Sequence, residues 1–474
     1  MEKAFAKLHR AFNPQSIAVV GDKREFGFMW LRAQSTFQGK LYSVQIDPRE
    51  IGHIKELGVE NYTSLLDIQG PIDLVIVAVP RAVAPRILED CINKRVGAAH
   101  FFTAGFAETD TEEGRKLERL LSKRAREANF CLIGPNCMGV FNPRLGVRQS
   151  AEQHTSTTGV VGFISQSGTH AITFSIEGHL QGVDINKSVS FGNGIVLDST
   201  DYLDYFGRDT DIKAVGMYLE GVRDGSRFLA MLREVSTRKP VVIWKGGQTE
   251  EGARAIASHT GSLAIPQAVW DAALMQAGAI RATNLEELID TLKALIYLPP
   301  VLGDGVGLVG GSGGQSVAIT DAFVRAGLKV PLLTQESYNK LTTFFNLVGG
   351  SCRNPVDPGT DRKELGHIME ILEQDAHIDN LVLMIWPAAR RLIHKLLESE
   401  IHPIVSLKER TRKPIMAVLP AFSSPESLQQ WETIAKELQE SGIPTFTTVE
   451  RGALALSNAL EYYKLQDSFN TTER

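Results

Sequence analysis

Short apolar runs that end in glycine or proline recur along this chain and alternate with helical patterns. In the first section the runs begin at residues 16, 40, 73, 98 and 130 and read SIAVVG, KLYSVQ, DLVIVAVP, AAHFFTAGF and FCLIGPN. Such runs are typical of parallel strands that are buried on both faces. Residues 83–94 and 112–128 carry Leu, Ala, Glu and Arg at the spacing of half-buried helices. The alternation predicts an α/β fold that opens with a doubly wound, Rossmann-like sheet.

Two further series of the same kind follow. One begins with GVVGFISQSG at 159 and continues through NKSVSFGN, KAVGMYLEG and KPVVIWKGG, with a period that resembles a flavodoxin-like domain. Prolines and glycines in YLPPVLGDG at 297 then predict a linker. After it, GVGLVGGSGG opens a third series with NLVLMIWP, KPIMAVLP and IPTFTTV. We therefore expect three α/β domains, over residues 1–147, 148–296 and 297–474.

Composition excludes several classes of protein. Apolar residues make up 43% and charged residues 22% of the 474, as in ordinary globular proteins, and the net charge of -5 gives no broad basic field for nucleic acid. No run approaches the ~18 apolar residues that span a bilayer. The four cysteines form no CxxC pair, so neither a disulfide framework nor a zinc site is expected. These features predict a cytoplasmic protein that binds no nucleic acid, membrane or metal through this chain.

Three glycine-containing turns follow predicted strands, where free backbone N–H groups favour anions. The first turn, Gly21 to Gly27, has Lys23 where a dinucleotide motif needs its second glycine, so it is either a phosphate site or a structural turn with solvated cations. Ser165-Gln166-Ser167-Gly168 precedes a predicted helix and gathers hydroxyls at its start; Ser167 could equally be a simple N-cap. The third turn, Gly310 to Gly314, lacks the Lys-Ser/Thr ending of a Walker A loop.

A histidine stands among small and hydroxyl-bearing residues at 252–262, after the run VVIWKGGQ. We expect a loop there that presents the imidazole of His259 openly. A largely neutral imidazole can attack phosphorus through its free nitrogen. Glu220 ends a predicted strand and could bond one ring nitrogen, which would leave the other free to react. The same residues also fit a hydrogen-bonded surface histidine and a carboxylate in solvent.

Nine segments together resemble the coenzyme A-binding alpha subunit of the ADP-forming acyl-CoA synthetases, relatives of succinyl-CoA synthetase. They are FNPQSIAVVG at 12, DLVIVAVP at 73, TAGFAE at 103, IGPNCMGVFNP at 133, ISQSG at 164, SFGN at 190, YLEG at 218, GGQTEEGARAIASHTGSLA at 246 and RNPVD at 353. The likeness extends over nearly the whole chain. It implies a Rossmann-like CoA-binding domain followed by two flavodoxin-like domains.

The resemblance also implies roles for individual residues. His259 would be the phosphorylated histidine, Glu220 its carboxylate partner, and Ser165, Gln166, Ser167 and Gly168 the turn that holds phosphate. Coenzyme A would lie along three loops, with Asn136 near the thioester. The loop residues are Gly21, Asp22, Lys23, Val79, Pro80, Arg81, Thr103, Ala104 and Gly105. Phosphate would convert an acyl-CoA to an acyl phosphate, His259 would take the phosphoryl group, and a nucleoside diphosphate would receive it.

The family's ATP-grasp module, which binds ATP or ADP and Mg²⁺, does not match any section of this chain. A separate ATP-grasp beta subunit is therefore expected, and with it a hetero-oligomer that acts on an acyl-CoA or a carboxylic acid. Two loops depart from the family pattern: GDKREFG replaces GAS-x-x-PG, and SFGNGIVLD lacks the charged GNKAD form. They leave open a non-catalytic or regulatory CoA-binding protein. A nicotinamide-dependent oxidoreductase would use Asp47, but the glycine motif is imperfect.

Overall fold

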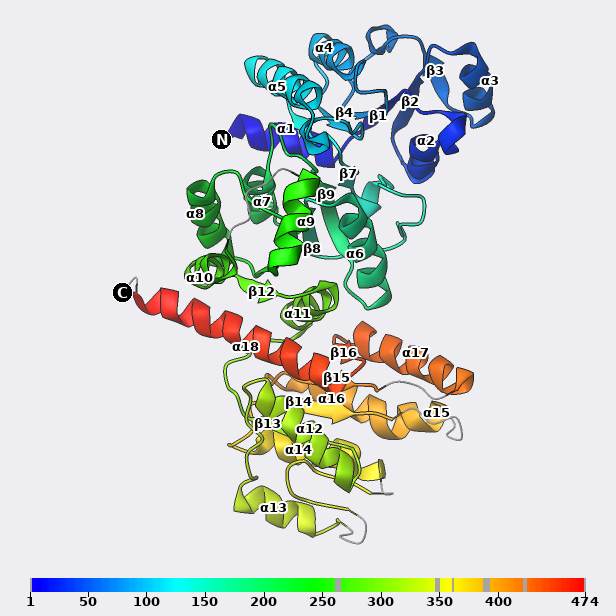
Figure 1. Ribbon diagram of the computed structural model, residues 1–474. Helices are drawn as coiled ribbons and strands as arrows, with labels where there is room; N and C mark the ends of the chain where they lie inside the picture. The colour runs from blue at the N-terminus through cyan, green and yellow to red at the C-terminus, as the bar shows by residue number, and fades with distance from the viewer. Residues whose placement is uncertain are drawn as a thin grey trace. The chain divides into compact units, whose positions relative to one another are not determined.

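A computed structural model describes residues 2–260, 266–345, 350–359, 362–386, 393–420 and 424–472. The chain divides into two compact units, Met1–Leu288 and Ile289–Arg474 (Figure 1). Parallel strands alternate with helices in both units, which confirms the predicted α/β fold. None of the helices in the described ranges is long and apolar enough to cross a membrane.

The first sheet is wholly parallel and has the strand order β3-β2-β1-β4-β5-β6. Its strands are β1 (Ser16–Val20), β2 (Lys40–Val44), β3 (Glu60–Tyr62), β4 (Leu74–Val77), β5 (Ala98–Phe101) and β6 (Leu132–Ile133). The five predicted apolar runs form five of these strands. Because the order reverses between β1 and β4, the loops after these strands border the crevice where such sheets bind ligands.

Helices and short 3-10 turns connect the strands of the first sheet. The helices are α1 (Glu2–Phe12), α2 (Met29–Ala33), α3 (Pro48–Glu56), α4 (Ala84–Lys94) and α5 (Glu112–Glu127), and the turns are η1 (Arg24–Phe26), η2 (Gln34–Thr36), η3 (Leu65–Asp67) and η4 (Ala107–Thr109). The predicted helices 83–94 and 112–128 agree with α4 and α5 to within one residue. Helix α5 begins after Thr111, whose hydroxyl accepts the N–H of Gly114 at 3.1 Å and so satisfies a free donor.

The second sheet has the order β12-β11-β10-β8-β9-β7. Strands β8 (Val161–Ser165), β9 (Ile185–Ser190), β10 (Ala214–Leu219), β11 (Val241–Lys245) and β12 (Ile280–Ala282) are parallel in a flavodoxin-like order. Strand β7 (Gly139–Phe141) pairs antiparallel with β9. Because β7 precedes the whole β8–β12 series, the chain contributes an edge strand before it enters that series.

Five helices and one 3-10 turn accompany the second sheet. They are η5 (Pro143–Leu145), α6 (Gly168–Leu180), α7 (Ser199–Arg208), α8 (Gly225–Ser236), α9 (Glu250–Thr260) and α10 (Gln267–Ala277). Helix α11 (Leu285–Tyr297) continues from the first unit into the second, which begins at Ile289. Helix α7 begins with a capping box in which Asp198 and Asp201 each accept a backbone N–H. One cluster of buried apolar side chains includes residues of both sheets, from Ile17 on β1 to Ile243 on β11. The two sheets therefore share a core.

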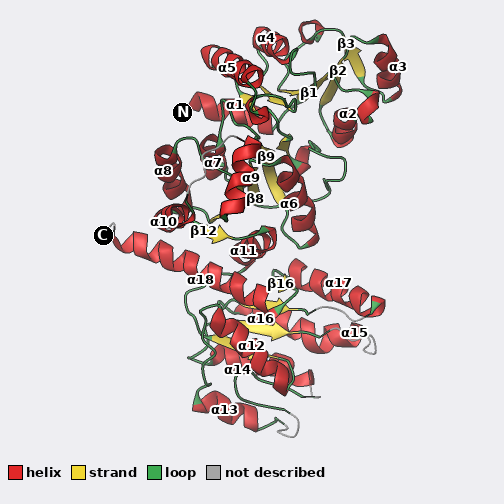
Figure 2. Cartoon of the chain, in the orientation of Figure 1, coloured by secondary structure: helices red, strands yellow, loops and turns green. Residues whose placement is uncertain are grey.

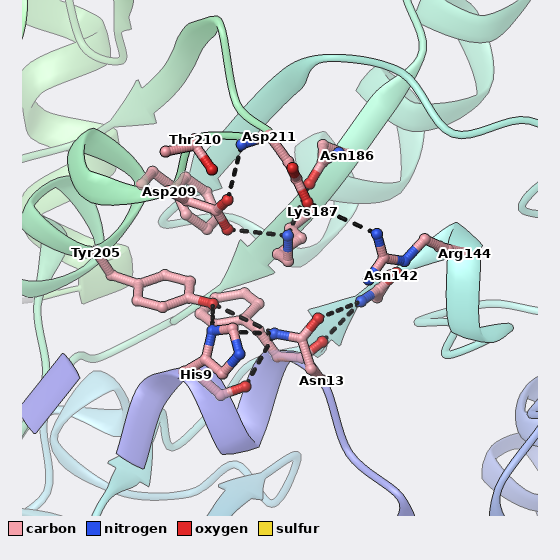
Figure 3. Close-up of polar contacts among 12 residues, drawn as sticks. His9, Asn13, Asn142, Arg144, Asn186, Lys187, Tyr205, Asp209, Thr210 and Asp211 are labelled. Atoms are coloured by element: carbon pink, nitrogen blue, oxygen red, sulfur yellow. Dashed lines mark hydrogen bonds and ion pairs between the residues drawn. The ribbon is translucent and has the colours of Figure 1, made fainter. Parts of the chain in front are cut away.

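Polar contacts also join helix α1 to the second sheet (Figure 3). Asn13 lies within 3.4 Å of the Tyr205 hydroxyl, and Asn142 donates to the carbonyl of Phe12 at 2.8 Å. The ring of Phe12 stacks on Tyr205 with centroids 4.9 Å apart. Nearby, the buried Lys187 pairs with Asp209 at 2.9 Å. The contacts of Phe12 and Asn13 tie the end of α1 to α7 and to the residue that follows β7.

The second unit is built on a parallel sheet of β13 (Val306–Val309), β14 (Asn380–Met384), β15 (Ile415–Val418) and β16 (Thr445–Phe446), in that order. Figure 2 shows its strands in yellow and its helices in red. Its helical elements are α12 (Gly313–Arg325), α13 (Gln335–Thr342), η6 (Arg362–Glu364), α14 (Leu365–Gln374), α15 (Ile393–Leu396), the π-helix η7 (Leu397–Ile401), α16 (His402–Arg410), α17 (Pro425–Glu440) and α18 (Val449–Thr472). These strands match the third predicted series. The domain boundaries at 147/148 and 296/297 stay predictions.

Candidate active site

The Ser165–Gly168 turn leads from β8 into helix α6. Ser167 is the N-cap, as its hydroxyl accepts the N–H of His170 at 3.3 Å. Ser165 is fully buried, and its hydroxyl accepts the N–H of Ser167 at 3.1 Å and donates to the Ser167 carbonyl at 2.6 Å. These bonds fix the conformation of the turn. The remaining N–H groups of the first helical turn have no partner within the helix, so the turn can also bind an anion.

Glu220 directly follows β10, beside this turn. The side-chain oxygen of Gln166 accepts the backbone N–H groups of Glu220 at 2.9 Å and Gly221 at 3.2 Å, and the Gln166 N–H donates to the Tyr218 carbonyl at 3.0 Å. Only 9% of the surface of Glu220 is exposed. The backbone at Glu220 is therefore hydrogen-bonded to the predicted phosphate turn, and the two predicted site elements are adjacent.

A cavity of about 390 Å³ lies over these residues. Its walls come from both sheets of the first unit and comprise Phe102, Asn136, Cys137, Met138, Gln166, Ser167, Gly168, Thr169, Ile172, Thr173, Gly192, Asn193 and Glu220. Five of the predicted site residues line it together: Asn136, Gln166, Ser167, Gly168 and Glu220. Its volume is within the range of about 300–1,000 Å³ that is usual for ligand pockets.

Asn136 joins the first sheet to the second at this cavity. Its backbone is left-handed, with φ 57°, and its N–H donates to the Thr103 carbonyl at 3.0 Å. Its side-chain amide donates to Asn193 at 3.4 Å. Asn193 in turn donates to Glu108 at 2.7 Å and to Glu118 at 3.0 Å. The sequence did not identify Asn193 as a site residue, although its position directly after the run that forms β9 was a usable signal.

The predicted coenzyme loops follow the neighbouring strands β1, β4 and β5. Gly21 has φ +85°, and a Cβ there would stand 2.5 Å from Cγ1 of Val79. Thr103 donates its hydroxyl to the Val79 carbonyl at 2.7 Å. A Cβ on Gly105, at φ +105°, would lie 2.7 Å from Cδ of Arg81. The three loops therefore contact one another, and their glycines expose backbone to which an extended ligand can bind closely.

Side chains in these loops differ in their exposure and in whether they already have hydrogen-bond partners within the chain. Arg81 donates to the Gly105 carbonyl at 2.9 Å and to Glu113 at 2.8 Å, while Pro80 and Ala104 are exposed. Lys23 is half-buried at the start of η1. These positions fit an anionic ligand along the carboxyl edge of the sheet, and their roles in coenzyme binding stay predictions.

Asp22, another predicted coenzyme residue, has a structural role. Its carboxylate accepts the N–H groups of Trp30 at 3.0 Å, Leu31 at 2.9 Å and Lys23 at 3.1 Å. It is 4% exposed, and burial raises the pKa of the carboxyl although these three bonds lower it. Asp22 thus caps the start of α2, and this role accounts for an acid at this position without any ligand.

His259 lies in the last turn of helix α9, so the prediction of a loop around it was wrong. The segment EEGARAIASHT has two glutamates in its first turn and three alanines, which favour a helix over a loop. The side chain of His259 and residues 261–265 lie outside the described part of the structure. Helix α9 contacts η4, the turn that follows the Thr103–Gly105 loop. This contact brings the helix of the predicted nucleophile to the coenzyme loops.

A nicotinamide-dependent enzyme would use Asp47 to bind ribose, but in this chain its carboxylate is already hydrogen-bonded to Arg49. Its carboxylate accepts from Arg49 at 2.7 Å and caps α3 through the Arg49 N–H at 3.0 Å. These bonds lower its pKa to about 2. The structure therefore gives no support to a ribose-binding role.

Comparisons with known proteins agree with this geometry. Residues 15–143 match the CoA binding domain model, and residues 158–295 match the succinyl-CoA ligase like flavodoxin domain. The chain is 32% identical to the ADP-forming acetate–CoA ligase I subunit alpha of Pyrococcus furiosus, over 96% of this chain and 98% of that subunit. The chain belongs to the ADP-forming acyl-CoA ligases.

Other ligases of the family are longer or structurally characterised. The chain is 32% identical to ADP-forming acetate–CoA ligase I of Archaeoglobus fulgidus but spans only 64% of that protein's length. It matches a dinucleotide forming acetyl-coenzyme A synthetase 1 of Ca. Korarchaeum cryptofilum, solved with phosphate and ADP, at a TM-score of 0.85, with 27% identity over 98% of this chain and 99% of the other. These relatives favour a catalytic ligase over a regulatory CoA-binding protein.

A metal cluster and the third glycine turn are two other possible ligand sites. No group of three or more His, Cys, Asp or Glu that could hold a metal occurs among the residues described. The Gly310–Gly314 turn, in the second unit, precedes helix α12 and is closed by a capping box between Ser312 and Gln315. Its glycines at 310 and 311 have φ +93° and +104° and serve the turn itself. The conformation of the turn therefore accounts for these two glycines without a ligand.

Proposed function

We propose that this chain is the CoA-binding part of a ligase that interconverts acyl-CoA, phosphate and nucleoside diphosphate with carboxylic acid, coenzyme A and nucleoside triphosphate. The phosphoryl group would pass through His259. The observation that carries the proposal is the cavity itself, where Asn136, the Ser165–Gly168 turn and Glu220 line one space. A thioester, a phosphate and a histidine-orienting carboxylate are the groups that such chemistry must bring together.

Each residue has a defined task. The N-terminal turn of α6 binds orthophosphate through backbone N–H groups and holds it for attack on the thioester carbonyl, which releases the coenzyme thiol and forms an acyl phosphate. One imidazole nitrogen of His259 then attacks phosphorus and releases the carboxylate. Glu220 accepts a hydrogen bond from the other ring nitrogen and stabilises the cation that forms on phosphorylation. The loops of Gly21, Val79 and Gly105 bind coenzyme A.

The nucleotide half of the reaction belongs to a second component. The match to 98% of an alpha subunit supports a separate beta subunit with an ATP-grasp fold, which would bind ATP or ADP with Mg²⁺. The fused relative, of which this chain spans 64%, supports the same division of labour within one polypeptide. We therefore propose a hetero-oligomer in the cytoplasm in which His259 carries phosphate between two sites.

The first experiment needs this chain alone. We would incubate it with an acyl-CoA and ³²P-labelled orthophosphate and assay for acid-labile, base-stable label on protein. Label on wild type that is absent from His259→Ala supports the proposal. His402→Gln, which changes a half-exposed histidine on α16, should label like wild type. Coenzyme A binding with no label on wild type would instead support the regulatory alternative.

The second experiment tests the partner. Labelling of His259 from γ-³²P-ATP and Mg²⁺ should require a co-purified ATP-grasp subunit. Labelling of this chain by ATP in the absence of any other protein would contradict the proposed division.

A further inference from the structure

Three aromatic rings from three different elements pack together beside the cavity. They belong to His170 in the first turn of α6, Tyr218 on β10 and Trp244 on β11. Their centroids are 4.3 Å apart for His170 and Tyr218, 4.6 Å for His170 and Trp244, and 4.7 Å for Tyr218 and Trp244. Each ring is adjacent to one part of the proposed site: the phosphate turn, Glu220 and the loop that leads into α9. The aromatic cluster therefore connects all three.

Within this cluster, Tyr218 also reaches the carboxylate. Its hydroxyl lies 3.4 Å from Oε1 of Glu220, and the side chain is 7% exposed. Burial and the nearby charge of Glu220 both raise the pKa of the Tyr218 hydroxyl. The hydroxyl therefore keeps its proton and acts as a donor. A hydrogen bond from a neutral donor to a carboxylate stabilises the ionised form and restricts its orientation.

The loop beyond β11 leaves room for this contact. A Cβ at Gly246 would stand 2.7 Å from the Tyr218 hydroxyl and 3.4 Å from Cγ of Glu220. The buried ammonium of Lys245 donates to the carbonyls of Gly246 and Gly247, both at 3.1 Å. Gln248 donates to the Lys245 carbonyl at 3.0 Å. A glycine and a bonded loop thus hold a gap into which the tyrosine hydroxyl fits.

We propose that Tyr218 is a positioning residue for phosphoryl transfer, acting through Glu220. The proposal rests on the proposed function, in which Glu220 orients the imidazole of His259. With the hydroxyl in place, Glu220 is held in one orientation while ionised. Without it, the carboxylate loses this hydrogen bond and takes up a proton at higher pH, so that fewer histidines are correctly oriented.

The titratable groups around Glu220 bear on this pH argument. Tyr218 lies on β10, which Glu220 follows, His170 lies on α6, and Lys245 ends β11; under the proposed function the imidazole of His259 joins them. Burial lowers the pKa of His170 and also that of Lys245. The Lys245 ammonium is bonded to carbonyls, so it does not replace the Tyr218 hydroxyl. Removal of the hydroxyl should therefore move the acid limb of the reaction toward higher pH.

The test is Tyr218→Phe, which keeps the ring and removes only the hydroxyl. We measure the initial rate of His259 labelling from acyl-CoA and labelled orthophosphate between pH 5 and 9. We expect a rate about tenfold lower, an acid limb about one pH unit higher and an unchanged KM for acyl-CoA, since hydrogen bonds to charged groups have about this strength. Tyr202→Phe is the matched control, because Tyr202 is a fully buried tyrosine on α7 whose hydroxyl has no partner among the described residues.

A double variant separates positioning from general loosening of the fold. If Tyr218 acts through Glu220, Tyr218→Phe should have little further effect in a Glu220→Gln background. Wild-type rates and pH dependence in Tyr218→Phe would overturn the inference, as would an equal loss of rate at every pH. Failure of wild type to label at all would instead refute the proposed function.

Discussion

Acid should weaken the first unit through a single buried histidine. His100 lies on β5, is 1% exposed, and has its ring 5.0 Å from the ring of Trp30. Neither ring nitrogen has a hydrogen-bond partner among the described residues. Burial lowers the pKa of His100 from 6.5 to about 3. Between these values the unfolded chain binds a proton that the folded chain excludes, so stability is full above pH 6.5 and is lost as the pH falls below it.

The size of the loss follows from the unfolded pKa. Between pH 7.5 and pH 5, a group with an unfolded pKa of 6.5 that stays neutral when folded loses about 2 kcal/mol of stability. A folded pKa of about 4 would give nearly the same loss, because the folded histidine would still be mostly neutral at pH 5. The result therefore depends little on how far burial lowers the pKa.

Hydrogen exchange of the β4 and β5 amides, corrected for intrinsic exchange rates, measures the local free energy of opening without a two-state assumption for the whole chain. His100→Phe and His100→Leu should both remove about 2 kcal/mol from the difference between pH 7.5 and pH 5. A change in ring packing would shift the free energy of opening by the same amount at both pH values. His394→Gln, on the exposed surface of α15, should keep the wild-type pH dependence. Wild-type pH dependence in both His100 variants would refute the reasoning.

Three further changes test other parts of the chain. Gly21→Ala should weaken coenzyme A binding by at least tenfold in calorimetry, because φ +85° and the neighbouring Val79 leave no room for a Cβ. Asp290→Ala should destabilise the second unit by about 3–5 kcal/mol in urea unfolding, since it removes the carboxylate that bonds Arg451 at 2.6 Å. Met138→Ala should enlarge the cavity that Met138 lines, so that under the proposed function longer acyl groups are accepted in a substrate panel; an unchanged preference would contradict a role for Met138 in selecting the acyl group.

The sequence predicted the parts of the fold that depend on long buried strands. The runs at Ser16, Leu74 and Val161 form strands, because a short uninterrupted apolar run is typical of a parallel strand that is buried on both faces. Strands β3, β7 and β12 were missed, because Glu60–Tyr62 is polar and because Gly139–Phe141 and Ile280–Ala282 have only three residues each. Pairing with a neighbouring strand, rather than local composition, defines such short elements.

For the site, strand ends were more informative than residue types. Glu220 and the Ser165–Gly168 turn were predicted because carboxyl ends of parallel strands meet, and the structure places them side by side. Asp22 has the residue type of a ligand contact, yet its carboxylate bonds backbone N–H groups. Tyr218 was not singled out, since a tyrosine within an apolar run is typical of a buried core strand. Only the three-dimensional structure shows that its hydroxyl reaches Glu220.

Strand β7 precedes the predicted domain boundary at 147/148 but pairs with β9 in the second sheet, so the two predicted domains share a strand. If the chain were divided at 147/148, the fragment with β8–β12 would lack the strand that pairs with the edge of β9. The first fragment would carry β7, Gly139–Phe141, as an unpaired strand. Each fragment would then expose an open edge that promotes aggregation unless the other is present. The two halves should behave as a split reporter: insoluble when expressed singly, and active when co-expressed so that β7 can rejoin its sheet.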